Sequence, residues 1–117
     1  MAETIFATGS RKTATARLWL MPAGNGITVN GRPLESYFGR SDLVRLATAP
    51  LHTTGTASQF GATCTVAGGG LSAQAGAVSL ALARALVAHN PDLRKTLKSA
   101  ELLKRDPREK ERMKYGL

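Results

Sequence analysis

Three consecutive glycines, Gly68, Gly69 and Gly70, are the residues whose type and spacing first suggest chemistry. They stand between a short segment of alternating polarity and a long alanine-rich segment, which predicts a strand, a loop and a helix in that order. Glycine loses more backbone freedom on folding than any other residue, so three in a row require a reason. One reason is a phosphate held at the N-terminus of the helix, where free N–H groups and the dipole favour an anion. The other is a close approach to a second backbone, and the residues alone leave both open.

The glycine loop does not match the phosphate loops of well-known nucleotide enzymes. A Walker loop ends in Gly-Lys-Ser/Thr, but here Leu71 and Ser72 follow the third glycine. The dinucleotide fingerprint needs spaced glycines rather than a run of three. Residues 69–73 superficially resemble the ATP loop of some small-molecule kinases. Those enzymes are much longer than this chain and need a metal-binding carboxylate, so a phosphate-binding catalyst is kept only as an alternative hypothesis, which an ATP titration would test.

The side chains that most often carry catalysis are few. His52 and His89 are the only histidines, and Cys64 is the only cysteine. His89 falls in the last turn of the predicted long helix, where a cation suits the dipole, and His52 falls in a predicted polar loop. Cys64 alternates with apolar residues on a strand and is expected to be a small buried hydrophobe. No metal-ligand spacing and no acid–base pair is visible in the sequence, so we expect no metal and no cofactor.

Positive charge is the second strong signal in the sequence. Sixteen Lys and Arg face eight Asp and Glu, a net charge of +8 with a pI near 10.4. A small domain with such an excess of positive charge usually binds a polyanion, most often nucleic acid. Residues 94–117 alone hold nine basic and four acidic side chains. The six aromatic residues do not alternate with basic ones, so we expect contact with phosphates and shape rather than base stacking. The alternatives are a solubilising surface charge or a basic module for a protein or membrane partner.

Alternation and helical spacing predict an α+β fold, a four-stranded mixed sheet with helices packed on one face. The strands are predicted at 3–8, 13–21, 27–29 and 60–66, and the helices at 33–38, 41–49, 71–89 and 92–98. Pro50 is expected to stop the second helix and to begin a loop over 51–59. Arg11, Lys12 and Arg17 are expected to cluster around the turn between the first two strands.

The length favours one domain, which we place at residues 1–98, followed by an extended basic C-terminal arm at 99–117 that orders on a partner. No continuous apolar run approaches the roughly 18 residues of a membrane span. The N-terminus lacks a basic segment followed by an apolar one, and a single cysteine favours a reducing compartment. We therefore expect a cytoplasmic protein with no membrane partner.

Four segments of the chain, in order, resemble the sequence blocks of one family. The segments are 9–17 (GSRKTATAR), 27–38 (ITVNGRPLESYF), 66–86 with its glycines, and 102–117 (LLKRDPREKERMKYGL). The family is the ninth protein of the small ribosomal subunit, in its bacterial or organellar form. The resemblance implies the fold of the second domain of ribosomal protein five, with a left-handed crossover. It also implies a structural role without catalysis, with ribosomal RNA of the subunit head and neighbouring head proteins as partners.

The resemblance also carries over individual RNA-binding residues from the hairpin and the C-terminal arm. They are Arg11, Lys12, Arg17, Lys104, Arg105, Arg108, Arg112, Lys114 and Tyr115. This chain has Ser10 where the family usually has arginine and Met113 where it often has lysine. The family usually continues beyond the equivalent of Leu117 with a very basic tail that reaches the peptidyl-site tRNA. We therefore carry over the ribosomal RNA contact and not the tRNA contact.

Overall fold

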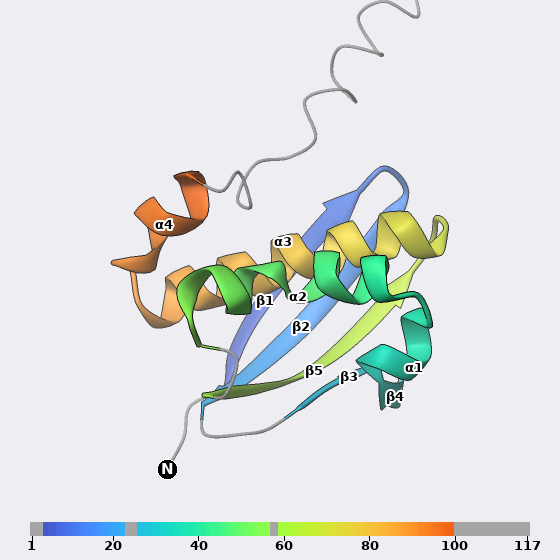
Figure 1. The fold of residues 1–117 in the computed structure, drawn as a ribbon, viewed down its shortest axis with the longest axis horizontal. Coiled ribbons are helices and arrows are strands. Elements are labelled where there is room, and N and C mark those ends of the chain that lie inside the picture. The colour runs from blue at the N-terminus through green and yellow to red at the C-terminus, as the bar shows by residue number, and fades with distance from the viewer. Residues whose placement is uncertain (1–3, 23–25, 57–58, 100–117) are drawn as a thin grey trace, which may run out of the picture.

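A computed structural model describes residues 4–22, 26–56 and 59–99 and has the predicted α+β architecture (Figure 1). The strands are β1 (Ile5–Arg11), β2 (Ala14–Pro22), β3 (Gly26–Val29), β4 (Arg32–Pro33) and β5 (Phe60–Ala67). The helices are α1 (Leu34–Phe38), α2 (Ser41–Thr54), α3 (Leu71–His89) and α4 (Leu93–Ser99). The strand order is β1-β2-β5-β3-β4, with β3 and β5 parallel and the other pairs antiparallel. The mixed sheet is thus confirmed, but it has five strands rather than four because Arg32–Pro33 pairs with the end of β3.

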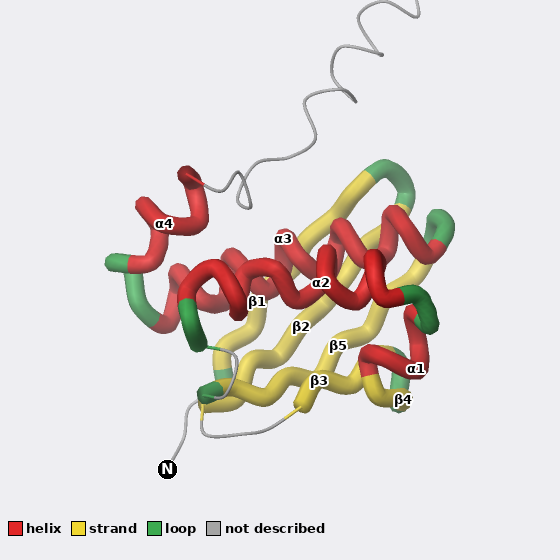
Figure 2. Tube along the Cα trace, in the orientation of Figure 1, coloured by secondary structure: helices red, strands yellow, loops and turns green. Residues whose placement is uncertain are grey.

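The predicted helical layer is confirmed, since α2 and α3 cover one face of the sheet (Figure 2). Strand alternation explains this, because Ala14, Ala16, Leu18 and Leu20 of β2 are fully buried against that layer. Small residues bring α3 very close to β1. A Cβ added at Gly9 would lie 2.5 Å from the Ala77 carbonyl oxygen and from the Ala81 amide nitrogen. We call the opposite side of the sheet, turned away from α2 and α3, the open face.

The composition of α3 follows from its central position. Among the described residues, α3 is the one helix that is long and apolar enough to cross a membrane, with a mean hydropathy of 1.5. That test rests on length and composition only, and 72% of the helical window is buried inside the protein. Packing between the sheet and α2 accounts for the run of alanine and leucine.

The second helix differs from its prediction. Pro50 does not end α2, which continues to Thr54. A proline inside a helix costs about 3 kcal/mol because one hydrogen bond is lost and the ring crowds the preceding turn. Here the continued turn buries Pro50 and Leu51 in the core, and the Thr54 hydroxyl donates to the Pro50 carbonyl oxygen at 2.9 Å. The helix ends instead at Gly55, whose φ of 70° is left-handed. The predicted loop over 51–59 was therefore wrong in its first half, and His52 belongs to a helix.

The end of the chain is described only as far as α4. This helix covers nearly the predicted range of 92–98, and Leu97 is fully buried in the core. The predicted arm at 99–117 lies almost wholly outside the described residues, so the division into a domain at 1–98 and an arm stays a prediction.

Candidate nucleic-acid interface

The β1–β2 turn and the start of α3 meet at one end of the molecule and enclose a hollow of about 290 Å³. We call it the hairpin hollow, and its lining residues are Arg11, Lys12, Thr13, Gly69, Gly70, Ser72 and Ala73. The turn between the strands has two residues, and Lys12 takes a left-handed φ of 55° there. The structure therefore brings together two basic side chains and two of the three glycines that the sequence analysis selected separately.

The three glycines do not share one role. Gly68 has a φ of 81°, and a Cβ added to it would overlap the carbonyl oxygen of Thr13 in the hairpin turn. Gly69 has a φ of 64°, and its added Cβ would lie 3.3 Å from both the Cβ and the amide nitrogen of Ala14. Gly70 has no described atom within 4 Å of its added Cβ and faces the hollow. The first two glycines thus permit a close approach to the hairpin backbone, and the third leaves room for a ligand.

The electrostatics of the hairpin hollow favour an anion. The amide of Gln74 donates to the Gly70 carbonyl at 2.9 Å, so the amides of residues 71–73 precede the first hydrogen bond within α3. No described side chain caps this end of α3. The aliphatic part of Arg11 lies across Gly76 on the first turns of the same helix, and Lys12 is exposed beside it. Free amides, a helix dipole and two cations together can hold a phosphate group.

A polar network behind the hollow fixes the glycine loop. The Gln74 side chain donates from Nε2 to the Gly68 carbonyl at 3.0 Å and accepts at Oε1 from the Tyr37 hydroxyl at 2.6 Å. Asn30 donates to the Val66 carbonyl at 3.1 Å and accepts from the Val66 amide at 2.9 Å. The Asn30 side-chain amide also reaches the Tyr37 hydroxyl at 3.3 Å. Loop, α1 and α3 are thereby held in one arrangement.

The sequence patterns did not predict the hydrogen-bond network of Asn30, Tyr37 and Gln74. The Asn30-Gly31 pair indicated only a turn, and Tyr37 indicated only a helical segment. The one usable signal was Gln74, an amide side chain one turn into a helix that is otherwise rich in alanine. It is also 9% exposed, and a buried amide normally needs hydrogen-bond partners.

Arg17 does not join the cluster around the turn, so that prediction was wrong. It lies on the open face, opposite Thr8 on β1 and Thr65 on β5. There it lines a separate shallow hollow of about 370 Å³ with Thr15, Thr65, Val66 and Ala67. Arg11 pairs with Ala14, which is fully buried on the helix side, and the two arginines therefore point to opposite faces of the sheet.

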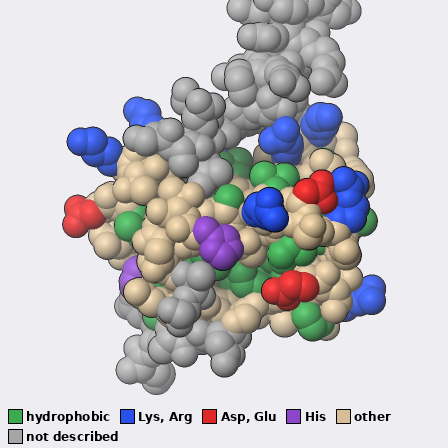
Figure 3. Space-filling model, viewed as in Figure 1, with side chains coloured by type: hydrophobic (Ala, Val, Ile, Leu, Met, Phe, Trp, Pro, Cys, Tyr) green, Lys and Arg blue, Asp and Glu red, His purple; other side chains and the backbone are tan. Residues whose placement is uncertain are grey.

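A second group of cations lies at the far end of α3. Lys and Arg side chains gather over the β1–β2 turn and over α4 on the helix side (Figure 3). The exposed basic residues of α4 are Arg94, Lys95 and Lys98. The remaining predicted RNA-binding residues, Lys104, Arg105, Arg108, Arg112, Lys114 and Tyr115, lie outside the described residues.

The one cysteine and the histidines offer no reactive centre. Burial raises the pKa of the Cys64 thiol to about 12, which keeps it protonated, as expected of a small buried hydrophobe. The ring of His89 packs edge-on against Phe60, with 5.0 Å between ring centroids. No group of three or more His, Cys, Asp or Glu side chains able to hold a metal occurs within the part of the chain that the structure describes.

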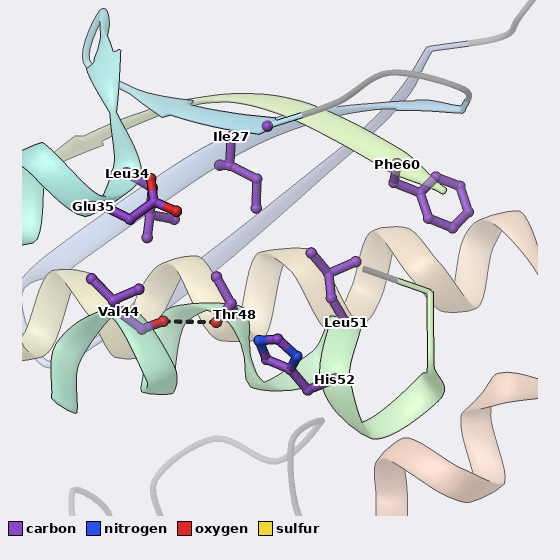
Figure 4. Close-up of a pocket in the computed structure, with 9 residues that line it drawn as sticks. Ile27, Leu34, Glu35, Val44, Thr48, Leu51, His52 and Phe60 are labelled. Atoms are coloured by element: carbon purple, nitrogen blue, oxygen red, sulfur yellow. Dashed lines mark hydrogen bonds between the residues drawn. The ribbon is translucent and has the colours of Figure 1, made fainter. Parts of the chain in front are cut away.

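A largely apolar pocket of about 210 Å³ lies between β3, α1 and α2, and the sequence did not predict it. Ile27, Leu34, Val44, Leu51 and Phe60 line its interior, and Glu35 and His52 enter it from different helices (Figure 4). The Thr48 hydroxyl in its wall already donates to the Val44 carbonyl at 2.8 Å. A carboxylate and an exposed imidazole without a nucleophile or oxyanion donors do not form a catalytic set.

A comparison with protein families gives a match over almost the whole chain. The model of the family described as Ribosomal protein S9/S16 matches residues 9–117. The matched range contains the β1–β2 turn, the glycine loop, all of α3 and the basic C-terminal segment.

Proposed function

Because the chain belongs to the ribosomal protein S9/S16 family, we propose that it binds ribosomal RNA of the small-subunit head through the hairpin hollow and its C-terminal arm. Membership makes it a structural, non-enzymatic, RNA-binding protein of the small ribosomal subunit that takes part in translation. Its partners as a family member are ribosomal RNA and other ribosomal proteins. The head as its position, particular head proteins as neighbours and the cytoplasm as its compartment remain predictions.

One observation carries the proposal for the hairpin hollow. Arg11 and Lys12 stand beside the start of α3, where Gly70 leaves open space and the first helical amides are free of intrahelical bonds. A phosphodiester group in the hollow would accept hydrogen bonds from those amides and would be neutralised by the two side chains. Such contacts are independent of base identity, so the hollow would position the protein on folded RNA rather than read a sequence.

The basic residues beyond α4 form the second part of the proposed interface. Arg94, Lys95 and Lys98 are exposed on α4 and lead directly into the segment that contains Lys104, Arg105, Arg108, Arg112, Lys114 and Tyr115. Cations that follow one another along a chain can neutralise successive phosphates and release their counterions. We therefore propose a second RNA contact that begins with the basic residues of α4, at the opposite end of α3 from the hairpin hollow.

The test measures the affinity of the full chain for a transcript of the small-subunit head RNA at several salt concentrations. Lys12→Asn removes one charge, and asparagine tolerates the left-handed φ of 55° at that position. We expect weaker binding and a salt dependence reduced by about one phosphate contact.

Arg45→Gln is the matched control, because Arg45 is an exposed cation on α2 outside the hairpin hollow. It should change the affinity much less than Lys12→Asn. Equal effects of both variants would show that net charge alone drives binding and would contradict a site at the hollow. Co-sedimentation of the chain with small subunits at high salt tests the ribosomal assignment independently.

A further inference from the structure

The open face of the sheet is a second surface that the hairpin hollow does not use. Two of the three exposed large apolar side chains among the described residues lie on it, Phe6 at 51% and Met21 at 36% exposure. The β1–β2 register places Phe6 directly opposite Trp19, and their ring centroids are 5.1 Å apart with the planes tilted by 47°. Apolar rings that face away from the core add nothing to the buried layer, so another role should explain their exposure.

The surroundings of the aromatic pair are polar and carry positive charge. Thr63 of β5 lies opposite Trp19, and Thr28 of β3 lies opposite Thr63. Two residues before Trp19 on β2, Arg17 lies between Thr8 of β1 and Thr65 of β5. None of these threonine hydroxyls is bonded to another group within the described residues. Arg84 adds a cation at the β1 edge, where its guanidinium donates to the Thr8 carbonyl at 2.9 Å.

Negative charge is missing from this face in the part of the chain that is described. The described carboxylates belong to Glu35 of α1, Asp42 of α2 and Asp92 before α4. A surface with aromatic rings, free hydroxyls and arginine but no carboxylate is complementary to a polyanion whose bases can stack. An apolar protein surface would leave Arg17 and the hydroxyls unsatisfied, so the composition favours RNA over an apolar protein neighbour.

We propose that the open face binds an unpaired segment of RNA, with one base stacked on the Phe6–Trp19 pair and the adjoining phosphate held by Arg17. The threonine hydroxyls beside the rings would contact the sugar 2′-hydroxyls and phosphates. This proposal rests on the proposed RNA-binding function and extends it from phosphate contacts to base stacking. The linear sequence did not indicate stacking, because Phe6 and Trp19 become neighbours only through the hairpin register.

Trp19 is the only tryptophan of the chain, so its fluorescence reports directly on the open face. The experiment titrates the full chain with single-stranded oligoadenylate of about twelve nucleotides, within the usual span of a stacking surface. We expect saturable quenching of Trp19 emission, and much weaker quenching by an RNA duplex of equal charge, whose bases are paired inside the helix.

Two substitutions of one residue separate stacking from apolar contact. Phe6→Leu keeps an apolar side chain but removes the ring, and it should weaken binding of the oligoadenylate about tenfold. Phe6→Tyr keeps the ring and should bind as the parent chain does. Since Phe6 is half exposed, neither change should prevent folding, and circular dichroism verifies this. Equal affinities of the two variants would overturn the proposal.

The failure of this proposal can be told apart from the failure of the proposed function. In one outcome, the anisotropy of labelled head RNA shows binding that Lys12→Asn weakens, but Trp19 emission does not change when the RNA binds. This outcome would refute the RNA site on the open face and leave the hairpin hollow as an RNA site. If Trp19 is protected from acrylamide quenching in assembled small subunits but RNA alone does not quench its emission, the open face contacts a protein neighbour instead. If neither RNA binds, the proposed function itself fails.

Discussion

Alanine substitutions in the glycine loop should destabilise the protein much more at Gly68 than at Gly70. Alanine at Gly68 must adopt a φ of 81°, which costs about 1–2 kcal/mol. Its Cβ would also overlap the Thr13 carbonyl oxygen, a backbone atom that cannot rotate away, and overpacking of this kind costs about 1–3 kcal/mol. Together the two costs lower the free energy of unfolding by about 3 kcal/mol, a large part of the roughly 5–15 kcal/mol that stabilises such a domain.

Gly70→Ala is the matched control for Gly68→Ala. Its φ of −92° suits any residue, and no described atom lies within 4 Å of the added Cβ. The loss should stay below about 1 kcal/mol, since alanine is poorer than glycine before a helix but restricts the unfolded chain more. Urea titration followed by far-ultraviolet circular dichroism gives both values, and the melting temperature of Gly68→Ala should fall by at least about 12 °C. Equal stabilities of the two variants would refute the assignment of Gly68 to hairpin packing.

Two further predictions concern buried groups. Gln74→Ala removes the hydrogen bonds to Gly68 and Tyr37 and should lower the free energy of unfolding by about 2 kcal/mol; combined with Tyr37→Phe, the loss should fall short of the sum by about 1 kcal/mol. Strict additivity in urea titrations would contradict a shared network. Cys64 should resist iodoacetamide at pH 8 in the folded protein and react once urea unfolds it, because its thiol has a pKa of about 12. Because burial raises this pKa from its ordinary value of about 9, the free energy of unfolding should fall as pH rises from about 9 towards 12, where the thiol ionises more easily in the unfolded chain. A free energy of unfolding that increases over that interval would be inconsistent with the burial.

Local patterns predicted the elements well where one face of a strand is buried. The alternation of β2 placed Ala14, Ala16, Leu18 and Leu20 in the core, and the structure buries all four. The same alternation put Cys64 on the buried side of β5. Pro50 shows the limit of this reasoning, because burial of Leu51 in the core outweighs a local penalty that is real in an isolated helix.

The candidate site was predicted only in parts. The sequence predicted Lys12 and the glycine loop as separate candidates. That they line one hollow depends on how α3 packs against the hairpin. The bonds from Asn30 to Val66 and from Tyr37 to Gln74 join residues more than thirty positions apart, so a local pattern could mark Gln74 as unusual but could not identify its partners. The separation of Arg11 from Arg17 follows from the two-residue turn, which pairs Arg11 with buried Ala14 and so sets the register.

β1 forms an edge of the sheet, and the cations near this edge bear on both self-association and RNA binding. An edge strand beside exposed Phe6 would ordinarily invite pairing with another chain. Arg84 reaches from α3 to occupy the Thr8 carbonyl on this edge, and a charged side chain there opposes strand addition. Because Arg17 lies opposite Thr8 on the adjoining face, the cations that discourage self-association also suit a polyanion. Arg84 thus protects the edge of the free protein, and Arg17 beside it adds positive charge to the proposed RNA surface.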